Sequence, residues 1–235
     1  MKAADYNICM IGHRGYSSKY HENTEQAFIK AAEHGSGGCE TDIRITKDGM
    51  LICSHNEEVI INDGTELIVA DTDYKDLVSR PLRNKRNNDE VYLCTFERYL
   101  EIMRDNNMVC FLELKGDFPD EKVAEVYATA DRVYDLSKFI LQSFSHENLK
   151  KSRKLYPDIP LMLTLGDEQL DYDFCFKYNI SLDIYFGAVN KGIIDRFHEH
   201  GLEVALWTVN EREDFEKCKL MNVDYIESDV FGGND

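Results

Sequence analysis

The sequence predicts an α/β fold, a TIM-type (β/α)8 barrel with a short insertion after its second strand. Strand-like and helix-like segments alternate from end to end, and eight units that each begin with a strand fit within 235 residues. Alternation of this kind is typical of parallel strands joined by crossover helices, and eight units at this length favour a closed barrel. A doubly wound open sheet is the alternative, because alternation alone does not show closure. No linker or low-complexity tract divides the chain, so a single domain over residues 1–235 is expected.

Most predicted strands are followed by a predicted helix. The first helix, residues 24–33, is amphipathic, and Asn23 is its expected N-cap because Gln26 completes a capping box. Residues 56–93 interrupt the alternation and form the predicted insertion. The predicted strands are residues 8–12, 39–45, 51–54, 109–114, 139–144, 161–165, 182–186, 202–209 and 225–227. The predicted helices are residues 24–33, 96–104, 122–134, 147–155, 170–178, 193–200 and 212–221.

The second predicted unit contains a hairpin. Residues 46–49 (TKDG) join two apolar strands, and Asp-Gly is typical of a tight two-residue turn. With Asp48 and Gly49 as that turn, opposed residues place Asp42 directly across from His55. We therefore expect the hairpin to return His55 to the carboxylates of the second strand.

The chain is strongly acidic, with 27 Lys and Arg against 44 Asp and Glu and a net charge of −17. This charge repels nucleic acid and anionic membranes over most of the surface, so neither is an expected partner. An anionic substrate would need a local cationic site, formed by a metal ion or by well-placed Arg and Lys. The basic cluster at residues 80–86 (RPLRNKR) either attracts such a substrate or is a solvated loop, the commoner role of such a run.

Cysteine usage and hydropathy predict a cytoplasmic protein. No apolar run is long enough to span a bilayer, and residues 1–7 contain no secretory hydrophobic core, so stable membrane insertion is not expected. Seven cysteines occur without CxxC spacing. Several of them, such as Cys9, Cys53 and Cys110, lie in apolar strands, which suits buried thiols in a reducing compartment. The oligomeric state is left open.

Polar side chains with catalytic potential gather where the predicted strands end, which is where barrel enzymes place their chemistry. His13 and Arg14 end the first strand. Glu40 and Asp42 are two residues apart in the second strand, so their side chains share one face. Glu113 and Lys115 repeat this spacing at the end of the strand at 109–114, which is the third strand of the barrel. Trp207 ends the seventh barrel strand, at 202–209.

Glu40, Asp42 and Glu113 predict a metal site. Three converging carboxylates with no cysteine ligand form a hard, oxygen-lined site that selects Mg²⁺, Ca²⁺ or Mn²⁺ over zinc. Without a cation they would repel one another and raise each other's pKa. The simpler alternative is that each carboxylate pairs with a nearby base such as Arg44.

His13 and His55 predict an acid/base pair that works on a phosphate ester. Phosphodiester cleavage needs one proton removed from the nucleophile and another delivered to the leaving oxygen. It also needs positive charge beside the phosphate oxygens, which the metal, Arg14 and Lys115 would supply. His13 alone is more often a structural histidine, but its place beside Arg14 and Gly15 at a strand end, with His55 arriving by a second route, favours catalysis.

These motifs resemble the glycerophosphodiester phosphodiesterase family (GDPD), over a stretch from Ile11 to about Asp229. The strongest matches are HRGYS at 13–17, ENT at 22–24, ETD at 40–42 and TKDG at 46–49 leading to His55. Weaker matches are ELK at 113–115, QSF at 142–144, WTVN at 207–210 and VDYIESD at 223–229. The set in this order is highly specific, although no single motif is.

The resemblance implies a TIM barrel that hydrolyses glycerophosphodiesters, which are small-molecule substrates, to glycerol 3-phosphate and an alcohol. Residues 56–93 match the family's insertion, which helps to shape the substrate pocket. The implied roles are metal binding for Glu40, Asp42 and Glu113, acid/base catalysis for His13 and His55, phosphate binding for Arg14 and Lys115, and the glycerol side for Trp207. The implied cofactor is a divalent cation, Mg²⁺ or Ca²⁺, with Mn²⁺ also compatible.

Three positions depart from the family pattern. Asn56 replaces the usual Asp after the second histidine, which removes a negative charge near His55 and should make its imidazolium less favoured. His21 replaces a Pro before the Glu-Asn pair. Glu227 adds a carboxylate in the last strand that the motif does not place.

Two other functions fit the same inventory. A cyclising phospholipase D or phosphoinositide-type lyase would share the barrel and its two-histidine chemistry, but the motifs at 113–115 and 207–210 count against it. A non-catalytic phosphosugar-binding barrel would bind without turnover, and the intact histidine pair counts against that function.

Overall fold

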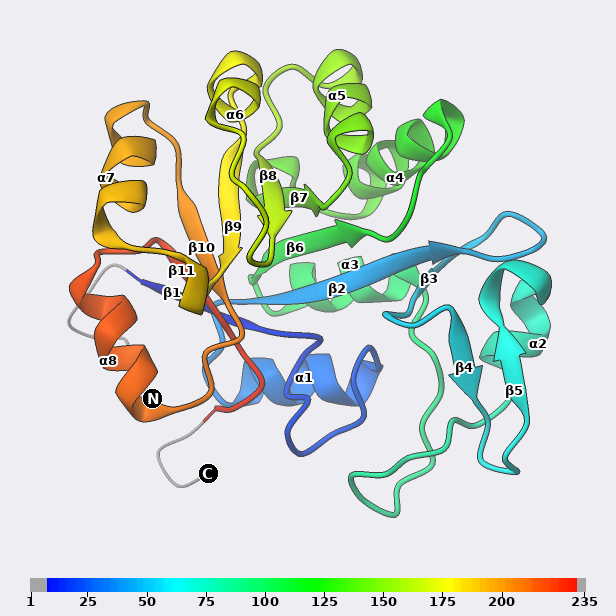
Figure 1. Cartoon of the computed structure of the whole chain (residues 1–235). Coiled ribbons are helices and arrows are strands. Elements are labelled where there is room, and N and C mark those ends of the chain that lie inside the picture. The colour runs from blue at the N-terminus through cyan, green and yellow to red at the C-terminus, as the bar shows by residue number, and fades with distance from the viewer. Residues whose placement is uncertain (1–7, 232–235) are drawn as a thin grey trace.

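The computed structural model describes residues 8–231, so residues 1–7 and the expectation about a secretory core there lie outside the described part. Within residues 8–231, eight parallel strands form a sheet in the order β1-β11-β10-β9-β8-β7-β6-β2. β1 (Cys9–Gly12) also pairs with β2 (Gly38–Ile45), which closes the sheet into a barrel (Figure 1). The predicted TIM barrel is confirmed, and the open sheet was the wrong alternative.

Helices follow the barrel strands in the predicted alternation and cover the outside of the barrel (Figure 1). Within residues 8–231, no helix combines the length and apolar character needed to cross a membrane. The other barrel strands are β6 (Val109–Leu114), β7 (Phe139–Ser143), β8 (Leu161–Leu165), β9 (Ser181–Tyr185), β10 (Val204–Trp207) and β11 (Tyr225–Ser228). The helices are α1 (Glu25–Glu33), α2 (Tyr74–Val78), α3 (Phe96–Asp105), α4 (Asp120–Val133), α5 (His146–Leu155), α6 (Tyr172–Tyr178), α7 (Lys191–Glu199) and α8 (Arg212–Leu220).

The barrel interior is layered, and this layering positions the site. Successive side chains of a strand point to opposite faces, so residues two apart share the interior. An apolar cluster unites five strands and consists of Ile11, Phe111, Ile140, Met162 and Ala205. The residues two positions further along these strands line one cavity, and they are His13, Glu113, Gln142, Thr164 and Trp207. The apolar layer therefore supports a polar layer at the carboxyl ends of the strands.

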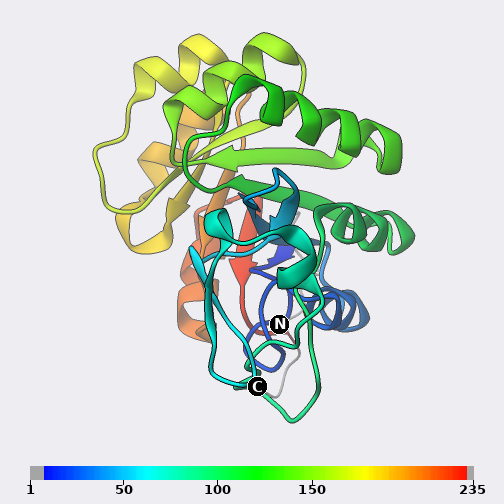
Figure 2. The ribbon, with the colours of Figure 1, turned by 90° about the vertical axis from the view of Figure 1, so that its right-hand side faces the viewer.

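The excursion between β3 (Leu51–Cys53) and α3 contains more regular structure than the sequence predicted. It holds an antiparallel hairpin of β4 (Glu58–Ile60) and β5 (Glu66–Ile68), followed by α2. Its apolar side chains pack with Ile52 of β3 into a cluster of their own, whose other buried members are Val59, Ile61, Val69, Leu77, Leu82, Val91 and Leu93. In the view of Figure 2, the excursion lies in front of one side of the barrel.

The predicted N-cap of α1 is wrong by one residue. Thr24 caps the helix, and its Oγ1 accepts a hydrogen bond from the N–H of Ala27 at 3.3 Å. Asn23 instead adopts a left-handed backbone with φ of 56°, which Asn tolerates better than most residues. Its side chain donates to Asp42 Oδ2 and accepts from Thr41 Oγ1, at 3.0 and 2.7 Å. Asn23 therefore braces β2 rather than the helix.

The predicted hairpin register is also wrong by one residue. Ile45 opposes Leu51, so five residues rather than two form the connecting loop. Thr46 stabilises this longer loop, since its Oγ1 accepts the N–H of Met50 at 2.9 Å. In consequence Ser54, not His55, lies across from Asp42, and its N–H donates to the Asp42 carbonyl at 2.9 Å.

Candidate active site at the barrel mouth

The candidate site lies at the carboxyl ends of the barrel strands. β2 and β6 pair in parallel with Asp42 beside Glu113, so the carboxylates of the two strands end at the same level. A cavity of about 100 Å³ opens there. The predicted site residues that line it are His13, Arg14, Glu40, His55, Glu113, Lys115 and Trp207. Asp42 contacts Arg14 and Lys115, so the structure brings the whole predicted set together.

Three buried carboxylates converge at this mouth. One oxygen from each of Glu40, Asp42 and Glu113 lies within 4.8 Å of the other two, and these residues are 1%, 1% and 6% exposed. Burial and the neighbouring carboxylates raise the pKa of Glu40 well above its ordinary value and the pKa of Glu113 to about 7. Ionising all three therefore requires added positive charge.

Arg14 and Lys115 supply part of that charge. Lys115 Nζ lies 2.6 Å from Glu113 Oε1 and 3.1 Å from Asp42 Oδ1, and Arg14 Nε lies 3.3 Å from Asp42 Oδ2. Burial raises the pKa of Asp42, but the charges of Arg14 and Lys115 outweigh it and hold that pKa below its usual range. Asp42 is therefore ionised at neutral pH, and its charge holds the side chains of Arg14 and Lys115 at the mouth.

The loop after β1 turns sharply to aim Arg14 into the mouth. Gly15 has φ of 83°, and a Cβ there would lie 2.6 Å from the backbone carbon of Ala27 in α1. Glycine is therefore required for the turn to pack against the helix. The turn directs the main-chain N–H of Arg14 at Glu40 Oε2, which accepts it at 3.0 Å.

His13 forms a dyad with Asp229, a residue that sequence reasoning did not assign. His13 Nδ1 donates to Asp229 Oδ1 at 2.8 Å, which leaves Nε2 for the cavity. Ser17 Oγ and Asn210 Nδ2 also donate to the Asp229 carboxylate, at 2.7 and 2.8 Å. Despite burial, the hydrogen bonds from His13, Ser17 and Asn210 lower the pKa of Asp229 to about 2. Asp229 is therefore an ionised group that fixes the His13 tautomer and orientation.

His55 reaches the same cavity from the far side of the hairpin. Its Nδ1 donates to Asn56 Oδ1 at 2.9 Å, so the neutral amide occupies the place of the family's usual Asp. Burial lowers the pKa of His55, and the charges of Arg14 and Lys115 lower it further, although Asp42 opposes them. The hydrogen bond to Asn56 itself raises the pKa of His55, so the lowering has other causes, and the effect of Asn in place of Asp stays a prediction.

Two further carboxylates in the mouth were missed or left unplaced. Asp183 in β9 and Glu227 in β11 line the cavity and are 1% and 2% exposed. Burial, followed by their mutual repulsion and the charge of Glu113, raises the pKa of Glu227 well above its ordinary value; burial and Glu113 do the same for Asp183. Each is the only acid in its strand and follows an apolar residue, as Glu113 does, so the strand pattern could have found both.

This donor set fits a divalent cation. Within the described chain, Arg14 and Lys115 face five buried carboxylates at the mouth, and both oxygens of Asp183 and Oε1 of Glu40 and Glu227 have no hydrogen-bond partner. Buried carboxylate oxygens without partners are costly, and a hard cation with oxygen ligands satisfies them. A second group of possible ligands, His13, Glu40 and Glu227, shares Glu40 with the first.

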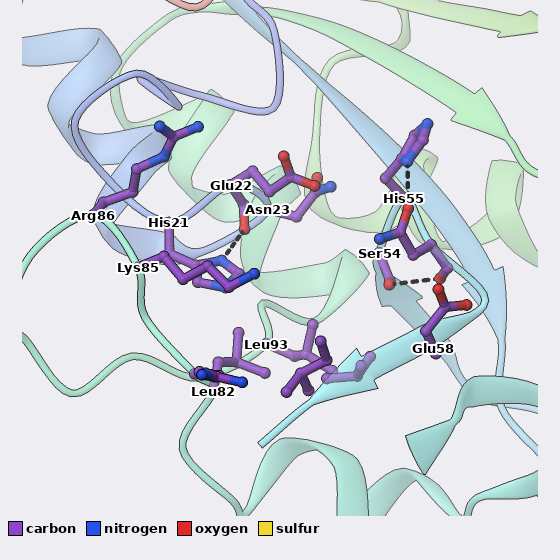
Figure 3. A pocket seen from close by; sticks show the side chains of 14 residues that line it. His21, Glu22, Asn23, Ser54, His55, Glu58, Leu82, Lys85, Arg86 and Leu93 are labelled. Atoms are coloured by element: carbon purple, nitrogen blue, oxygen red, sulfur yellow. Dashed lines mark hydrogen bonds between the residues drawn. The ribbon is translucent and has the colours of Figure 1, made fainter. Parts of the chain in front are cut away.

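A larger cavity of about 400 Å³ adjoins the mouth, and Figure 3 shows the side chains that line it. His55 lines both spaces. Its walls come from the loop before α1 and from the excursion, including Asn56, Leu82 and Leu93. A phosphoryl group held by Arg14 and Lys115 would therefore have a small space on one side and a larger one beyond His55.

The fold and the mouth together define an enzyme class, the phosphodiesterases built on a (β/α)8 barrel. The chain belongs to the glycerophosphoryl diester phosphodiesterase family, whose model matches residues 13–232. This match confirms the family that the motifs predicted, and it identifies the protein as an enzyme.

Relatives and solved structures agree with this family assignment. A glycerophosphodiester phosphodiesterase of Caldanaerobacter subterraneus is 26% identical over 228 residues, which cover 94% of this chain and 93% of the relative. Two solved structures share the fold. A phosphodiesterase of Oleispira antarctica in complex with the product sn-glycerol-3-phosphate has a TM-score of 0.83 and 18% identity, over 94% of this chain and 92% of the other. A glycerophosphodiester phosphodiesterase of Agrobacterium tumefaciens has a TM-score of 0.80 and 21% identity, over 94% of this chain and 96% of the other.

Proposed function

We propose that this protein hydrolyses glycerophosphodiesters to glycerol 3-phosphate and an alcohol, with a divalent cation and with His13 and His55 as the acid/base pair. The observation that carries the proposal is the entry of both imidazoles into one cavity that also contains Arg14 and Lys115. Acid, base and phosphate ligands are then within reach of one phosphorus atom.

In the proposed reaction, one P–O bond forms and one breaks. Water attacks phosphorus, its proton passes to one histidine, and the bond to the leaving alcohol breaks as the other histidine protonates that oxygen. The products are glycerol 3-phosphate and the free alcohol, and the two histidines exchange protonation states. An attack by the glycerol 2-hydroxyl would instead form a cyclic phosphate and release the same alcohol.

We assign His13 as the base. Asp229 accepts from His13 Nδ1 and bears a charge that stabilises the imidazolium formed when Nε2 takes a proton. A buried carboxylate behind a general base has this orienting and stabilising effect in other enzymes. His55 is then the acid, because it lines both cavities and so stands where the alcohol leaves the mouth.

Arg14 and Lys115 would hold the equatorial phosphate oxygens, since both are charged, half-buried groups at the mouth. Glu40, Asp42 and Glu113 would bind the cation, with Mg²⁺ or Ca²⁺ the proposed ion and Mn²⁺ also compatible. The cation, when bound, would offset negative charge on the phosphate. Trp207 would line the glycerol side, where its ring packs against Tyr185 at 5.5 Å between centroids.

The proposal predicts cation-dependent release of glycerol 3-phosphate from glycerophosphocholine. Purified protein would be incubated with Mg²⁺ or Ca²⁺, and the product followed by coupled oxidation, with EDTA as the control. Activity that EDTA abolishes and added cation restores is the expected result. Phosphorus NMR of the same mixture identifies the final product, and a persistent cyclic phosphate would instead support the cyclising lyase.

Asn56→Asp should move the basic limb of the pH profile of kcat/KM to higher pH. The aspartate would accept from His55 Nδ1 and stabilise the imidazolium, which raises the His55 pKa from its lowered value. A general acid must be protonated, so activity falls as pH rises through this pKa, and a higher pKa delays that fall. The pH profiles of the two proteins on glycerophosphocholine provide the measurement. Movement of the acidic limb instead would reassign His55 as the base.

A further inference from the structure

The larger cavity beside His55 contains unpaired positive charge, which is unexpected in a chain of net charge −17. Arg83, Lys85 and Arg86 line it, and none of their side chains forms an ion pair or hydrogen bond with another residue of the described chain. Arg80, three residues before Arg83, differs because its Nη2 lies 2.8 Å from Asp63 Oδ2. Three basic residues of the excursion therefore line the cavity, whereas Arg80 does not.

The loop that carries these bases is held in place by main-chain hydrogen bonds. The N–H of Arg83 donates to the Ile60 carbonyl at 2.8 Å, which ties the loop to β4. Asn84 Oδ1 accepts the N–H of Arg86 at 2.9 Å. Buried Leu82 and Leu93 anchor the segment in the apolar cluster of the excursion. The basic side chains are thus attached to an ordered wall.

The acidic residues that line the cavity do not neutralise this wall. Glu22 is bound by Arg14, whose Nη1 lies 3.3 Å from Glu22 Oε1. Glu58 lies on the side of His55, across the cavity from Lys85 and Arg86 (Figure 3). The wall opposite His55 is therefore left cationic, and unpaired guanidinium groups favour anions that accept paired hydrogen bonds, phosphate above all.

We propose that the enzyme prefers glycerophosphodiesters whose leaving alcohol carries a second phosphate group, and that Arg83, Lys85 and Arg86 bind that group. This inference rests on the proposed function, because it uses His55 as the acid at the exit of the alcohol. The diester phosphate lies at Arg14, the alcohol passes His55, and the cavity of about 400 Å³ has the size of a small-ligand site. Arg83, Lys85 and Arg86 then contact the phosphate at the far end of the leaving alcohol.

The test uses three substrates of graded charge and the full-length enzyme with Mg²⁺ or Ca²⁺. Glycerophosphoinositol 4-phosphate and glycerophosphoinositol differ by one phosphate monoester, and glycerophosphocholine has a cationic head group. We expect kcat/KM to be roughly tenfold higher with the extra phosphate than without it, through KM, a value typical of a few partly exposed charge contacts. We expect glycerophosphocholine to be the poorest substrate, and the preference to shrink as KCl is added.

The triple variant Arg83→Gln, Lys85→Gln and Arg86→Gln should lose most of the preference between the two inositol substrates. Arg80→Gln is the matched control, because Arg80 belongs to the same loop but pairs with Asp63. This variant should keep the preference for the substrate with the extra phosphate. An equal kcat/KM for the two inositol substrates, or an unchanged ratio in the triple variant, would overturn the inference while hydrolysis itself stands.

If none of the three diesters is hydrolysed, the proposed function fails and the anion site is tested separately by calorimetry. Glycerophosphoinositol 4-phosphate should then bind the wild-type protein more tightly than glycerophosphoinositol does, and the triple variant should bind the two alike. Equal binding of the two by the wild-type protein would overturn the inference as well.

Discussion

Replacing His13 with alanine should lower kcat by about 10²–10⁴-fold while the barrel remains folded. The variant loses the imidazole that we assign as the base, so water must attack without proton removal. Folding should survive because Ser17 and Asn210 continue to donate to Asp229, so that carboxylate keeps hydrogen-bond partners. Steady-state kinetics on glycerophosphocholine, with a thermal melt of each protein, provide the measurement.

His198→Ala is the matched control for this experiment. His198 also pairs with an aspartate, Asp224, at 2.9 Å between Nε2 and Oδ2, but that pair lies before β11, at the opposite end of the barrel. We expect its kcat to remain close to that of the wild-type protein. Asp229→Asn, which keeps the size of the side chain but removes the charge behind His13, should give an intermediate loss. Turnover at the wild-type rate in His13→Ala would refute the assignment of this residue as base.

Glu40→Gln should reduce kcat/KM by at least about 10²-fold and abolish stabilisation by the cation, since one charged ligand is lost. The glutamine oxygen can still accept the N–H of Arg14, so the fold keeps that bond. In EDTA the variant should be at least as stable as the wild-type protein, because the amide replaces a carboxyl whose charged form is already disfavoured by burial and by the neighbouring carboxylates. A saturating cation should raise the melting temperature of the wild-type protein by linkage, with about 2.7 kcal/mol expected at one hundred times Kd.

The thermal readout separates cation binding from catalysis. Glu33→Gln, which changes an exposed carboxylate paired with Lys30 on α1, is the control and should retain the cation-induced shift. An equal shift in Glu40→Gln and in the wild-type protein would remove Glu40 from the set of cation ligands, whatever its activity.

Strand periodicity explains which residues of the candidate site could be predicted from the sequence. Glu40 and Asp42 share a face because side chains alternate along a strand, and the structure places both in the interior. The same rule applied to β9 and β11 would have predicted Asp183 and Glu227, each of which is the only acid in its strand. The fold was predictable for a related reason, since alternating strands and helices at this length have few ways to bury their apolar faces.

The remaining differences depend on contacts that no local pattern encodes. Asp229 lies 216 residues from its partner His13, so their pairing follows from closure of the barrel. The hairpin gained three loop residues because Thr46 binds the N–H of Met50, a side-chain bond that competes with a tight turn. Asn23 lost the role of helix cap because β2 offers its side chain two partners at once.

Barrel closure also determines when activity can arise during synthesis. β11 lies between β1 and β10 in the finished sheet, and Asp229 follows it directly. A nascent chain that ends before residue 229 has His13 and the ETD motif but neither the last strand nor the carboxylate behind the base. Domains fold as units as they emerge from the ribosome. Turnover by ribosome-bound intermediates should therefore begin abruptly, once β11 has left the exit tunnel, and would report completion of the fold.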